Sequence, residues 1–391
     1  MHTIRIKETP KILLITNDYP PEFSGGISNV YFNLCKNDKY GLLKTIAPNT
    51  EAAKRFDKEF NLDTVRVRTP TKGGVLTRIA QLGLFFATAI IESFRNDVVA
   101  VWCGHVYLAL IGYMMKKLRG IPYFLYFHGG ETKAYLDKRS KAWVFKRIIS
   151  NSAFLFCNSS FTKKQILSSW EYGKPIYVLN PGVDLERYYP IESSTFNRKA
   201  EEFVLLTVGT LVERKGHDKV IEALASLKEE IPGIRYLIVG TGPELERLTH
   251  LAYRESGLDS IVDFLGFADD AEMSRYFNSA DVFIMPSRMT PDSRGTEGFG
   301  IVYLEANACG KPVIGGKSGG VPDAVMDGET GILVDPENVE DIKKAITWLY
   351  ENPDERMRMG ARGRERALSD FQWDGITERF IKIILKNLER A

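Results

Sequence analysis

Cysteine and histidine are scarce in this chain of 391 residues, which contains four cysteines and five histidines. The cysteines lie far apart and form no CxxC or Cys/His ligand spacing, so we expect neither a disulfide framework nor a zinc site. Their pattern is that of small buried apolar residues in a reducing compartment, and the cytoplasm is the expected location. They are Cys35, Cys103, Cys157 and Cys309.

Long uncharged apolar runs are also missing. The first ten residues, MHTIRIKETP, contain none, and we expect no signal peptide there. The most apolar stretch, residues 75–94, contains Arg78 and Gln81 and is short for a membrane span. We expect it to form a largely buried helix, with a surface-lying amphipathic helix as the alternative.

Two ligand signatures are absent as well. Neither half of the chain combines GxGxxG after a first strand with a ribose-binding acid, which a nicotinamide dehydrogenase would need. No DxD pair stands at a strand end, because Asp269 and Asp270 begin a predicted helix. We therefore expect no cofactor and no bound metal.

Charge is present in both signs but is unevenly distributed. Residues 1–190 contain 27 Lys and Arg against 15 Asp and Glu, whereas the remainder contains 25 against 35. A basic first half favours an anionic partner, such as a lipid headgroup layer, a phosphorylated acceptor or a nucleic acid. Undirected drift of surface charge is the alternative.

Short apolar segments alternate with helical patterns along the whole chain, which is typical of parallel α/β folds. In the first half the predicted strands are 11–18, 98–103, 123–129, 153–159 and 176–180. After a polar linker near 185–200 the pattern restarts, and the predicted strands are 203–209, 235–242, 262–267, 281–287 and 311–316.

The sequence thus predicts an α/β fold of two doubly wound Rossmann-like domains that face each other across a cleft. Ligands of such sheets bind at the carboxyl ends of the strands. We place the N-terminal domain at 1–190 and the C-terminal domain at 191–371. An amphipathic helix over 372–391 is expected to pack back on the first domain.

In the first domain, glycines and a histidine follow predicted strands. Gly25 and Gly26 open a helix, where backbone N–H groups can approach an anion, although an ordinary turn is the alternative. His128 stands at the end of a strand, where its side chain would point into the cleft, and a structural histidine is the alternative. Glu131 follows in the same turn and is a weaker candidate.

In the second domain, cations and carboxylates follow the predicted strands. Arg214 and Lys215 occupy a strand-to-helix turn, where two cations suit a diphosphate, although a solvated basic turn is the alternative. The N–H groups of residues 299–301 begin a helix and would form an anion site. Glu297 and Glu305 are separated by roughly 12 Å along the helix axis, similar to the distance from the sugar to the ribose of a nucleotide-sugar.

The motifs NDYPP…GGI, HGG, NPGVD, LVERKG, GTGP, EGFGIVYLEANACG and a terminal FQWD helix occur in this order. This set resembles the retaining glycosyltransferases of the GT-B fold, in their large fourth family, and the similarity covers nearly the full chain. NDYPPEFSGGI and EGFGIVYLEANACG most resemble the bacterial GDP-mannose-dependent phosphatidyl-myo-inositol mannosyltransferases. The resemblance implies a nucleotide-diphosphate-sugar donor in the second domain and an acceptor in the first.

The resemblance also implies a role for each matching residue. Glu305 would bind the ribose hydroxyls, and Glu297 with the amides of Phe299 and Gly300 would hold the transferred sugar. Lys215 would neutralise the diphosphate, and His128 would lie against the sugar near the reacting carbon. The implied catalytic residues are His128, Lys215 and Glu297. The implied donor-binding residues are Gly25, Gly26, Arg214, Lys215, Phe299, Gly300, Ile301 and Glu305, and Glu131 would bind the acceptor.

One position departs from the family pattern. The family usually has an arginine after the first strand of the second domain, in a pattern like GRLVxRKG, and this chain has Thr210 there. Lys215 and Arg214 must then carry the charge of the leaving group alone.

These expectations combine into one functional prediction. The chain is expected to be a retaining, metal-independent hexosyltransferase that moves mannose to a lipid-linked or otherwise anionic acceptor. It would be cytoplasmic, with a peripheral position at the inner face of the cell membrane left open. A UDP-sugar donor with a saccharide or small-metabolite acceptor is one alternative. A non-catalytic carbohydrate- or nucleic-acid-binding relative is another, although we expect no nucleic acid partner.

Overall fold

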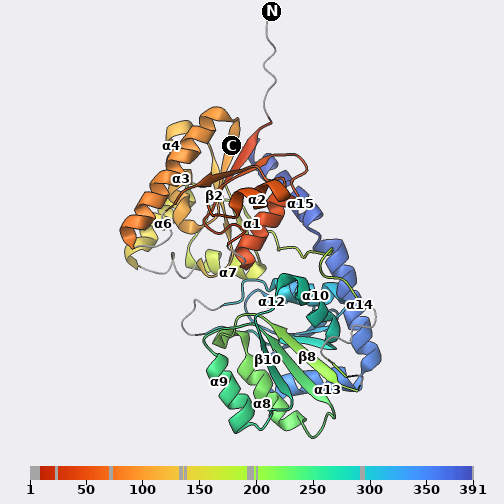
Figure 1. Cartoon of the computed structure of the whole chain (residues 1–391). Helices are drawn as coiled ribbons and strands as arrows, with labels where there is room; N and C mark the ends of the chain where they lie inside the picture. Colours follow the sequence, from red (N-terminus) through yellow and green to blue (C-terminus); the bar gives the residue numbers. More distant parts are fainter. Residues whose placement is uncertain are drawn as a thin grey trace, which may run out of the picture. The chain divides into compact units, whose positions relative to one another are not determined.

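The computed structural model of the chain describes residues 9–22, 25–69, 74–131, 135, 139–191, 198–199, 201–290 and 296–389 (Figure 1). The chain folds into two compact units, and each is described on its own. Unit 1 comprises Met1–Leu179 together with Trp373–Ala391, and unit 2 comprises Asn180–Gln372. Val183 and Tyr188 pack in a hydrophobic core of unit 2, so the first unit ends before the predicted boundary at residue 190.

Unit 1 is built on a seven-stranded sheet with the order β3-β2-β1-β4-β5-β6-β7, in which all neighbours are parallel. The strands are β1 (Lys11–Ile15), β2 (Leu43–Pro48), β3 (Thr64–Val67), β4 (Val98–Cys103), β5 (Tyr123–Phe127), β6 (Leu155–Cys157) and β7 (Ile176–Val178). The helices are α1 (Gly26–Lys36), α2 (Ala53–Glu59), α3 (Val75–Arg95), the 3₁₀ turn η1 (Val106–Leu108), α4 (Ala109–Arg119), α6 (Arg139–Ser150), α7 (Ser160–Ser169) and α15 (Trp373–Leu388).

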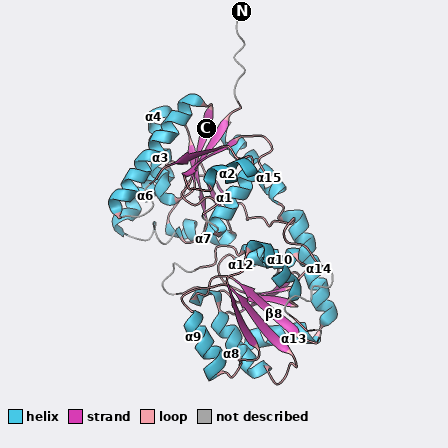
Figure 2. Ribbon diagram, in the orientation of Figure 1, coloured by secondary structure: helices cyan, strands magenta, loops and turns pink. Residues whose placement is uncertain are grey.

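Alternate residues of these strands face two different helix layers, because side chains of a strand point to opposite faces in turn. Helices α3 and α4 lie on one side of the sheet (Figures 1 and 2), and Phe85 of α3 and Met115 of α4 belong to the hydrophobic core there. On the other face, Phe380 of α15 contacts Trp102 of β4 and Phe156 of β6, with ring centroids 4.8 and 4.9 Å apart. Helix α15 therefore packs in unit 1.

Helix α3 lies on the surface, so the expectation of a largely buried helix is wrong. Phe85 and Ala89 face the core, whereas Leu76, Ile91 and Phe94 are exposed. Within the described residues α3 is the one helix that is long and apolar enough to cross a membrane by length and composition, and only 22% of its apolar window is buried. Hydrophobic content alone does not show how much of a helix the rest of the fold covers.

Unit 2 is built on a six-stranded parallel sheet with the order β10-β9-β8-β11-β12-β13. The strands are β8 (Phe203–Val208), β9 (Ile234–Val239), β10 (Val262–Gly266), β11 (Val282–Met285), β12 (Val313–Gly316) and β13 (Gly331–Val334). The helices are η2 (Glu213–Lys215, 3₁₀), α8 (His217–Leu227), α9 (Leu245–His250), the π-helical turn η3 (Leu251–Glu255), α10 (Asp270–Ser279), α11 (Ile301–Ala308), α12 (Val321–Ala324), α13 (Val339–Glu351) and α14 (Pro353–Asp370).

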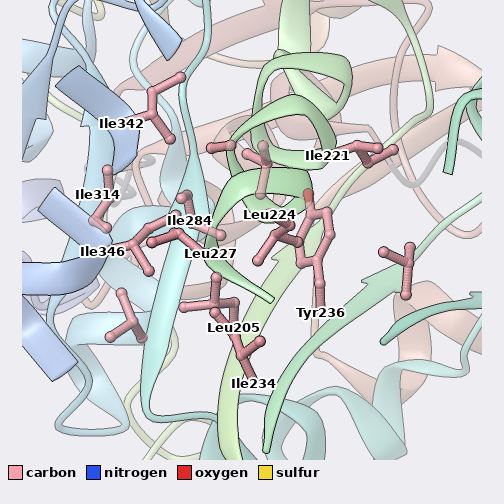
Figure 3. Packing of buried hydrophobic residues seen from close by; sticks show 14 of the residues in the cluster. Leu205, Ile221, Leu224, Leu227, Ile234, Tyr236, Ile284, Ile314, Ile342 and Ile346 are labelled. Atoms are coloured by element: carbon pink, nitrogen blue, oxygen red, sulfur yellow. The ribbon is translucent and has the colours of Figure 1, made fainter. Parts of the chain in front are cut away.

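The apolar core on one face of this sheet shows why the sequence folds in this way. The strands contribute β-branched and leucine side chains, and helices α8 and α13 contribute an apolar stripe with helical spacing. Figure 3 shows these side chains interlocking: Leu205, Ile234, Tyr236, Ile284 and Ile314 from the strands, with Ile221, Leu224, Leu227, Ile342 and Ile346 from the helices.

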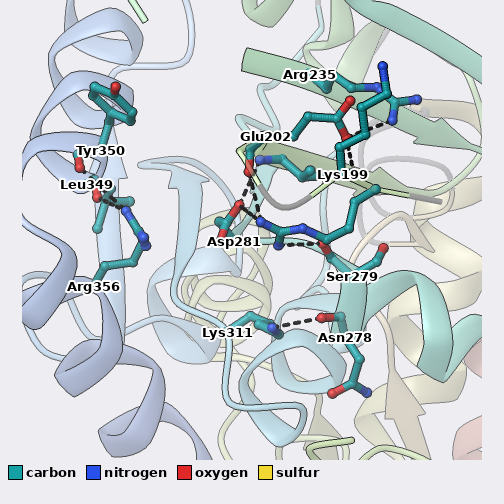
Figure 4. Close-up of polar contacts among 12 residues, drawn as sticks. Lys199, Glu202, Arg235, Asn278, Ser279, Asp281, Lys311, Leu349, Tyr350 and Arg356 are labelled. Carbon is teal, nitrogen blue, oxygen red and sulfur yellow. Dashed lines mark hydrogen bonds and ion pairs between the residues drawn. The ribbon is translucent and has the colours of Figure 1, made fainter. Parts of the chain in front are cut away.

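The amino ends of the unit 2 strands are held by matched polar pairs (Figure 4). Arg235 of β9 forms ion pairs with Glu202, at 3.0 Å, and with Asp263. Arg198 Nη2 lies 3.3 Å from Oδ2 of Asp281, the residue that precedes β11. These contacts tie neighbouring strands together at the edge where chain segments enter the sheet.

The predicted fold class is confirmed, and each of the ten predicted strand segments contains a strand. Strands β2, β3 and β13 were missed, since LKTIAP, TVRV and GILV are short or interrupted by polar residues. In each sheet the strand order reverses direction once, between β1 and β4 and between β8 and β11. Crevices for ligands form at such switch points, outside the carboxyl ends of the strands.

Candidate functional site

The switch point of unit 2 brings together the cations and the carboxylate that the sequence singled out. Lys215 belongs to the turn η2 that follows β8, and Glu297 belongs to the segment that follows β11. The two residues are 82 positions apart in the chain, yet Lys215 Nζ lies 2.6 Å from Glu297 Oε2. Arg214 Nη1 lies 2.8 Å from the same oxygen.

We call Arg214, Lys215 and Glu297 together the cation triad. Its two cations face a single carboxylate, so the group has an excess of positive charge. Burial opposes the ionisation of Glu297, but Lys215 and Arg214 outweigh it and lower the pKa of this carboxyl to about 2. Burial also lowers the pKa of Lys215, against the opposing pull of Glu297. Two cations, one buried and one partly exposed, therefore share one carboxylate oxygen, which is an electrostatic environment suited to a further anion.

Two features that the sequence analysis missed fix the turn that carries Lys215. Arg288 is buried and forms a bidentate pair with Asp218, with distances of 2.9 and 2.8 Å, and its backbone N–H donates to the carbonyl of Arg214. Gly216 has a φ of +75°, and a Cβ there would lie 2.3 Å from the carbonyl oxygen of Pro286. No spacing in the sequence links Arg288 with Asp218, since the contact depends on the fold.

The segment SGG at 318–320 holds Glu297. The N–H of Gly320 donates to the carbonyl of Glu297 at 2.8 Å. Gly319 has a φ of +58°, and a Cβ there would lie 2.5 Å from the same carbonyl oxygen. The two glycines of KSGGVPD thus allow the close backbone approach that orients this carboxylate.

Helix α11 begins at Ile301, as predicted, with Gly300 as its N-cap at a φ of +92°. Among residues 201–290 and 296–389, the N–H groups of Phe299, Gly300 and Ile301 donate to no acceptor. The side chain of Phe299 is buried beside Phe371, so only the backbone of this residue is left to contact a ligand. Glu305 is half-buried further along α11.

In unit 1 the predicted glycines begin α1, with Gly25 as the N-cap and Gly26 as the first helical residue. Neither has a positive φ, and a Cβ at either would meet no atom within 4 Å. Phe23 and Ser24 of the same motif lie outside the described residues. The structure thus gives no steric reason for the two glycines, and their role in anion binding stays a prediction.

His128 follows β5, is buried, and lies at the switch-point edge of the unit 1 sheet. Its Nε2 is 3.0 Å from the hydroxyl of Tyr31, 97 positions earlier in the chain. Its ring stacks on Tyr126 with centroids 4.6 Å apart. Burial lowers the pKa of His128 to about 3, with a smaller contribution from His105, so the imidazole is neutral at neutral pH.

The backbone of His128 is held from both sides. Glu131 Oε2 accepts its N–H at 3.1 Å, and Asn158 Nδ2 donates to its carbonyl at 3.0 Å. Burial raises the pKa of the Glu131 carboxyl. Glu131, predicted to bind the acceptor, has its carboxylate turned to the backbone of residue 128 in this structure.

A second pair at the unit 1 switch point was missed by the sequence analysis. His105, after β4, lies with Nε2 3.2 Å from Asp18 Oδ2, after β1. The neighbouring His105 imidazole lowers the pKa of Asp18, against the effect of burial. Within the described ranges, no group of three or more His, Cys, Asp or Glu side chains is arranged as metal ligands.

Comparison with known proteins gives two adjacent family matches. Residues 24–187 match the model described as Glycosyltransferase Family 4, and residues 190–366 match Glycosyl transferases group 1. A GDP-mannose-dependent alpha-(1-6)-phosphatidylinositol monomannoside mannosyltransferase from Mycolicibacterium smegmatis is 32% identical over 375 residues, covering 93% of this chain and 95% of its own. A GDP-mannose-dependent monoacylated alpha-(1-6)-phosphatidylinositol monomannoside mannosyltransferase from Corynebacterium glutamicum is 29% identical, covering 96% and 97%.

Solved structures are similar over nearly the whole chain. Sucrose-phosphate synthase from Thermosynechococcus elongatus has a TM-score of 0.79 at 21% identity, covering 98% of this chain and 100% of its own. Anabaena Alr3699/HepE in complex with UDP-glucose has a TM-score of 0.75 at 19% identity, covering 96% and 99%. At these identities the likeness shows the fold alone.

Proposed function

The chain belongs to the family 4 glycosyltransferases of the GT-B fold, and from this membership we propose that it moves mannose from GDP-mannose to a lipid-linked or otherwise anionic acceptor. The observation that carries the proposal is the cation triad of Arg214, Lys215 and Glu297 beside the amino end of α11. The GDP-mannose dependence of the relatives from Mycolicibacterium smegmatis and Corynebacterium glutamicum supports this choice of donor.

The diphosphate of the donor is assigned to the excess cations. The ammonium of Lys215 has three donors and the guanidinium of Arg214 has five, and each uses one on Glu297 Oε2. The remaining donors, with the N–H groups of residues 299–301, suit phosphate oxygens. Their positive charge stabilises the diphosphate more strongly as this leaving group acquires negative charge in the transition state.

The two glutamates are assigned to the hydroxyl groups at the ends of the donor. Among the described residues, Glu297 Oε2 receives both cations, and its other oxygen accepts no hydrogen bond. That oxygen can accept from a hydroxyl of the transferred sugar. Glu305, further along α11, is assigned to the ribose. Because the pKa of Glu297 is about 2, this carboxyl stays an acceptor over the whole physiological range.

For the chemical step we propose retention of configuration without a metal. The bond between the anomeric carbon and the diphosphate oxygen breaks, the acceptor oxygen bonds to that carbon on the same face, and the acceptor proton passes to the leaving phosphate. The resemblance to retaining enzymes supports this course. Lys215, Arg214 and the helix amides supply the positive charge that a divalent ion supplies in other transferases.

An anionic lipid surface is proposed as the place where the acceptor is met. Ile91 and Phe94 of α3 and Leu118 of α4 are exposed, and Lys117 and Arg119, also exposed, flank Leu118 in the sequence. The Arg119 guanidinium lies 3.8 Å from the Phe94 ring centroid. Neither Lys117 nor Arg119 pairs with a carboxylate in the described part of the chain. This α3–α4 patch combines apolar anchors with unmatched cations, as interfacial helices do.

A thermal-shift panel of nucleotide-sugars tests the donor, because a ligand that binds only the folded state raises the melting temperature. We expect the largest shift with GDP-mannose and smaller shifts with UDP-sugars. A larger shift with a UDP-sugar would favour the alternative donor class. The absence of a shift with every nucleotide-sugar, together with retained polysaccharide or RNA binding, would contradict the proposal and favour a non-catalytic relative.

A further inference from the structure

We infer that Tyr31 is a positioning residue that fixes His128 as the neutral tautomer protonated on Nε2, so that Nδ1 is presented to the substrate as a hydrogen-bond acceptor. The geometry of unit 1 carries this assignment. It goes beyond the proposed function, although one arm of its test relies on the transfer reaction.

The argument begins with a count of protons. The hydroxyl of Tyr31 has a single proton, and it donates that proton to the carbonyl of Gly104. The Tyr31 oxygen can therefore only accept at its second contact, the one 3.0 Å from His128 Nε2. The proton in that contact must belong to His128. A neutral imidazole with a proton on Nε2 has a lone pair on Nδ1.

The fold leaves Tyr31 little freedom to donate elsewhere. Tyr31 is fully buried on α1 and packs edge-on against Trp102, with centroids 5.2 Å apart. Its acceptor, the carbonyl of Gly104, follows β4. The N–H of Gly104 donates to Ile15 at 2.9 Å, and a Cβ at residue 104 would lie 2.9 Å from the Cβ of Thr16. The acceptor is thus anchored to β1 at the switch point.

The ring of His128 is equally constrained. Tyr126 stacks on it with an interplanar angle of 20°, and its backbone is held by Glu131 and Asn158. The Asn158 amide is itself oriented, because Thr162 Oγ1 donates to its Oδ1 at 2.8 Å. No residue in the described ranges bonds to Nδ1, so this atom is left for a hydroxyl of the substrate.

Protonation of the ring is disfavoured by its surroundings. Tyr31 and Tyr126 contact the ring, His105 and its partner Asp18 act on it electrostatically, and Glu131 lies on the backbone side. Burial dominates and lowers the pKa of His128 to about 3, since Asp18 only partly offsets it. His128 thus acts as an acceptor for a substrate hydroxyl, and it supplies no proton to the leaving group.

Nitrogen NMR of the histidine side chains tests the tautomer without any assay of function. The sequence has five histidines, so the His128 signals are identified by comparison with His128→Gln. In the wild-type protein we expect protonated Nε2 and unprotonated Nδ1 from pH 5 to pH 8. Tyr31→Phe removes the acceptor, and we expect the ring to become a mixture of both tautomers.

Tyr126→Phe is the matched control. Tyr126 also contacts the ring, but its hydroxyl donates to the carbonyl of Leu179, so its removal should leave the tautomer unchanged. A wild-type ring protonated on Nδ1, a cationic ring at pH 6, or an unaltered tautomer in Tyr31→Phe would each overturn the assignment. A melting temperature close to that of the wild type in Tyr31→Phe separates the result from misfolding.

The second arm uses the transfer reaction and rests on the proposed function. Tyr31→Phe is expected to lower kcat about tenfold, the factor that loss of one oriented hydrogen bond typically gives, with KM for the donor changed less. The pH profile of the wild-type enzyme should show no titration of His128 between pH 5 and pH 8. If no transfer is seen at all, the proposed function fails while the NMR arm still decides the tautomer.

Discussion

Arginine and lysine side chains are paired differently at the two edges of the unit 2 sheet. At the amino ends of the strands, Arg235 has two acidic partners and Arg198 has one (Figure 4). At the carboxyl ends, Arg214 and Lys215 converge on a single oxygen of Glu297. Arg235 and Arg198 are thus neutralised by acids of the chain, whereas Arg214 and Lys215 together carry charge that their one shared carboxylate does not neutralise.

This difference separates structural from functional ion pairs. A buried charge is costly unless it is paired, so a fold that only needs stability matches its cations with acids or, as for Lys311, with a backbone carbonyl. An unmatched cation at a switch point is tolerated where an external anion completes the pairing. In unit 1 the unpaired cation is of another kind: Arg119 lies over exposed Phe94 and is itself exposed, so water solvates it and its lack of a carboxylate partner in the described residues carries little cost.

The largest expected effect comes from removing one cation at each edge. Lys215→Met should lower kcat/KM for donor transfer by about 10³, because it removes a charge that stabilises the leaving diphosphate. Lys311→Met is the control at the amino edge, where the buried Lys311 ammonium donates to the carbonyl of Asn278 at 2.9 Å. It should lower the free energy of unfolding and leave kcat/KM unchanged. Equal loss of activity in both variants would contradict the distinction between a functional cation at the carboxyl edge and a structural cation at the amino edge.

Glu297→Gln is expected to lower kcat by about 10², and it also tests the electrostatics of the triad. The pKa of Glu297 in the folded state, about 2, lies below its ordinary value of 4.5. Its ionisation therefore stabilises the fold above pH 4.5, and this contribution is lost as the pH falls from 4.5 toward 2.

Urea unfolding at pH 7 and at pH 3.5 measures this contribution. The wild-type protein should lose more stability on acidification than Glu297→Gln, by on the order of 1–2 kcal/mol. Glu355→Gln, which removes the surface partner of Arg358, is the control and should keep the wild-type pH dependence. Parallel pH dependences of wild type and Glu297→Gln would count against a depressed pKa.

The α3–α4 patch extends the comparison to a surface. Replacing Ile91 and Phe94 together with serine should weaken binding to vesicles containing anionic lipid by at least about tenfold, because apolar burial is lost. Binding should also fall as salt rises. Met357→Ser, at an exposed residue of α14 in unit 2, is the control. Wild-type vesicle binding that depends on neither the anionic lipid content nor the salt concentration would contradict the assignment of lipid binding to this patch.

The smallest effect is expected at Thr210, where the family usually has an arginine. Thr210 is exposed in the loop after β8. Thr210→Arg adds a cation to the same edge, and we expect KM for GDP-mannose to fall by a factor of about three to ten. Thr210→Gln, which lengthens the side chain without charge, should have no such effect. A lower KM for GDP-mannose in Thr210→Gln as well would indicate that packing of the longer side chain, and not its charge, improves donor binding.

Much of the fold could be predicted from the sequence because buried parallel strands leave continuous apolar runs. KILLI and FVLLTV were recognised in this way, whereas TVRV of β3 was not, since its four residues are only half-buried and one is arginine. Helix α3 was misjudged for the opposite reason. Its apolar content was visible, but which of its sides the fold covers was not.

The candidate site was predictable only in part. Lys215 and Glu297 were singled out because each follows a strand, but their direct contact was not foreseen, since the sequence does not show that β8 and β11 are neighbours. Tyr31 gave no signal, because an aromatic residue in an amphipathic helix is usually core. Its role depends on Gly104 and His128, which other strands bring to it.

Calorimetric binding of GDP and GMP, in wild type and in Lys215→Met, tests the central claim most directly. The two nucleotides differ by one phosphate, so the ratio of their dissociation constants isolates the contribution of the diphosphate to binding. We predict that GDP binds the wild type at least about tenfold more tightly than GMP, and that this preference disappears in Lys215→Met. Equal affinities in the wild type, or a preference that survives the substitution, would contradict the assignment of the cation triad to the diphosphate.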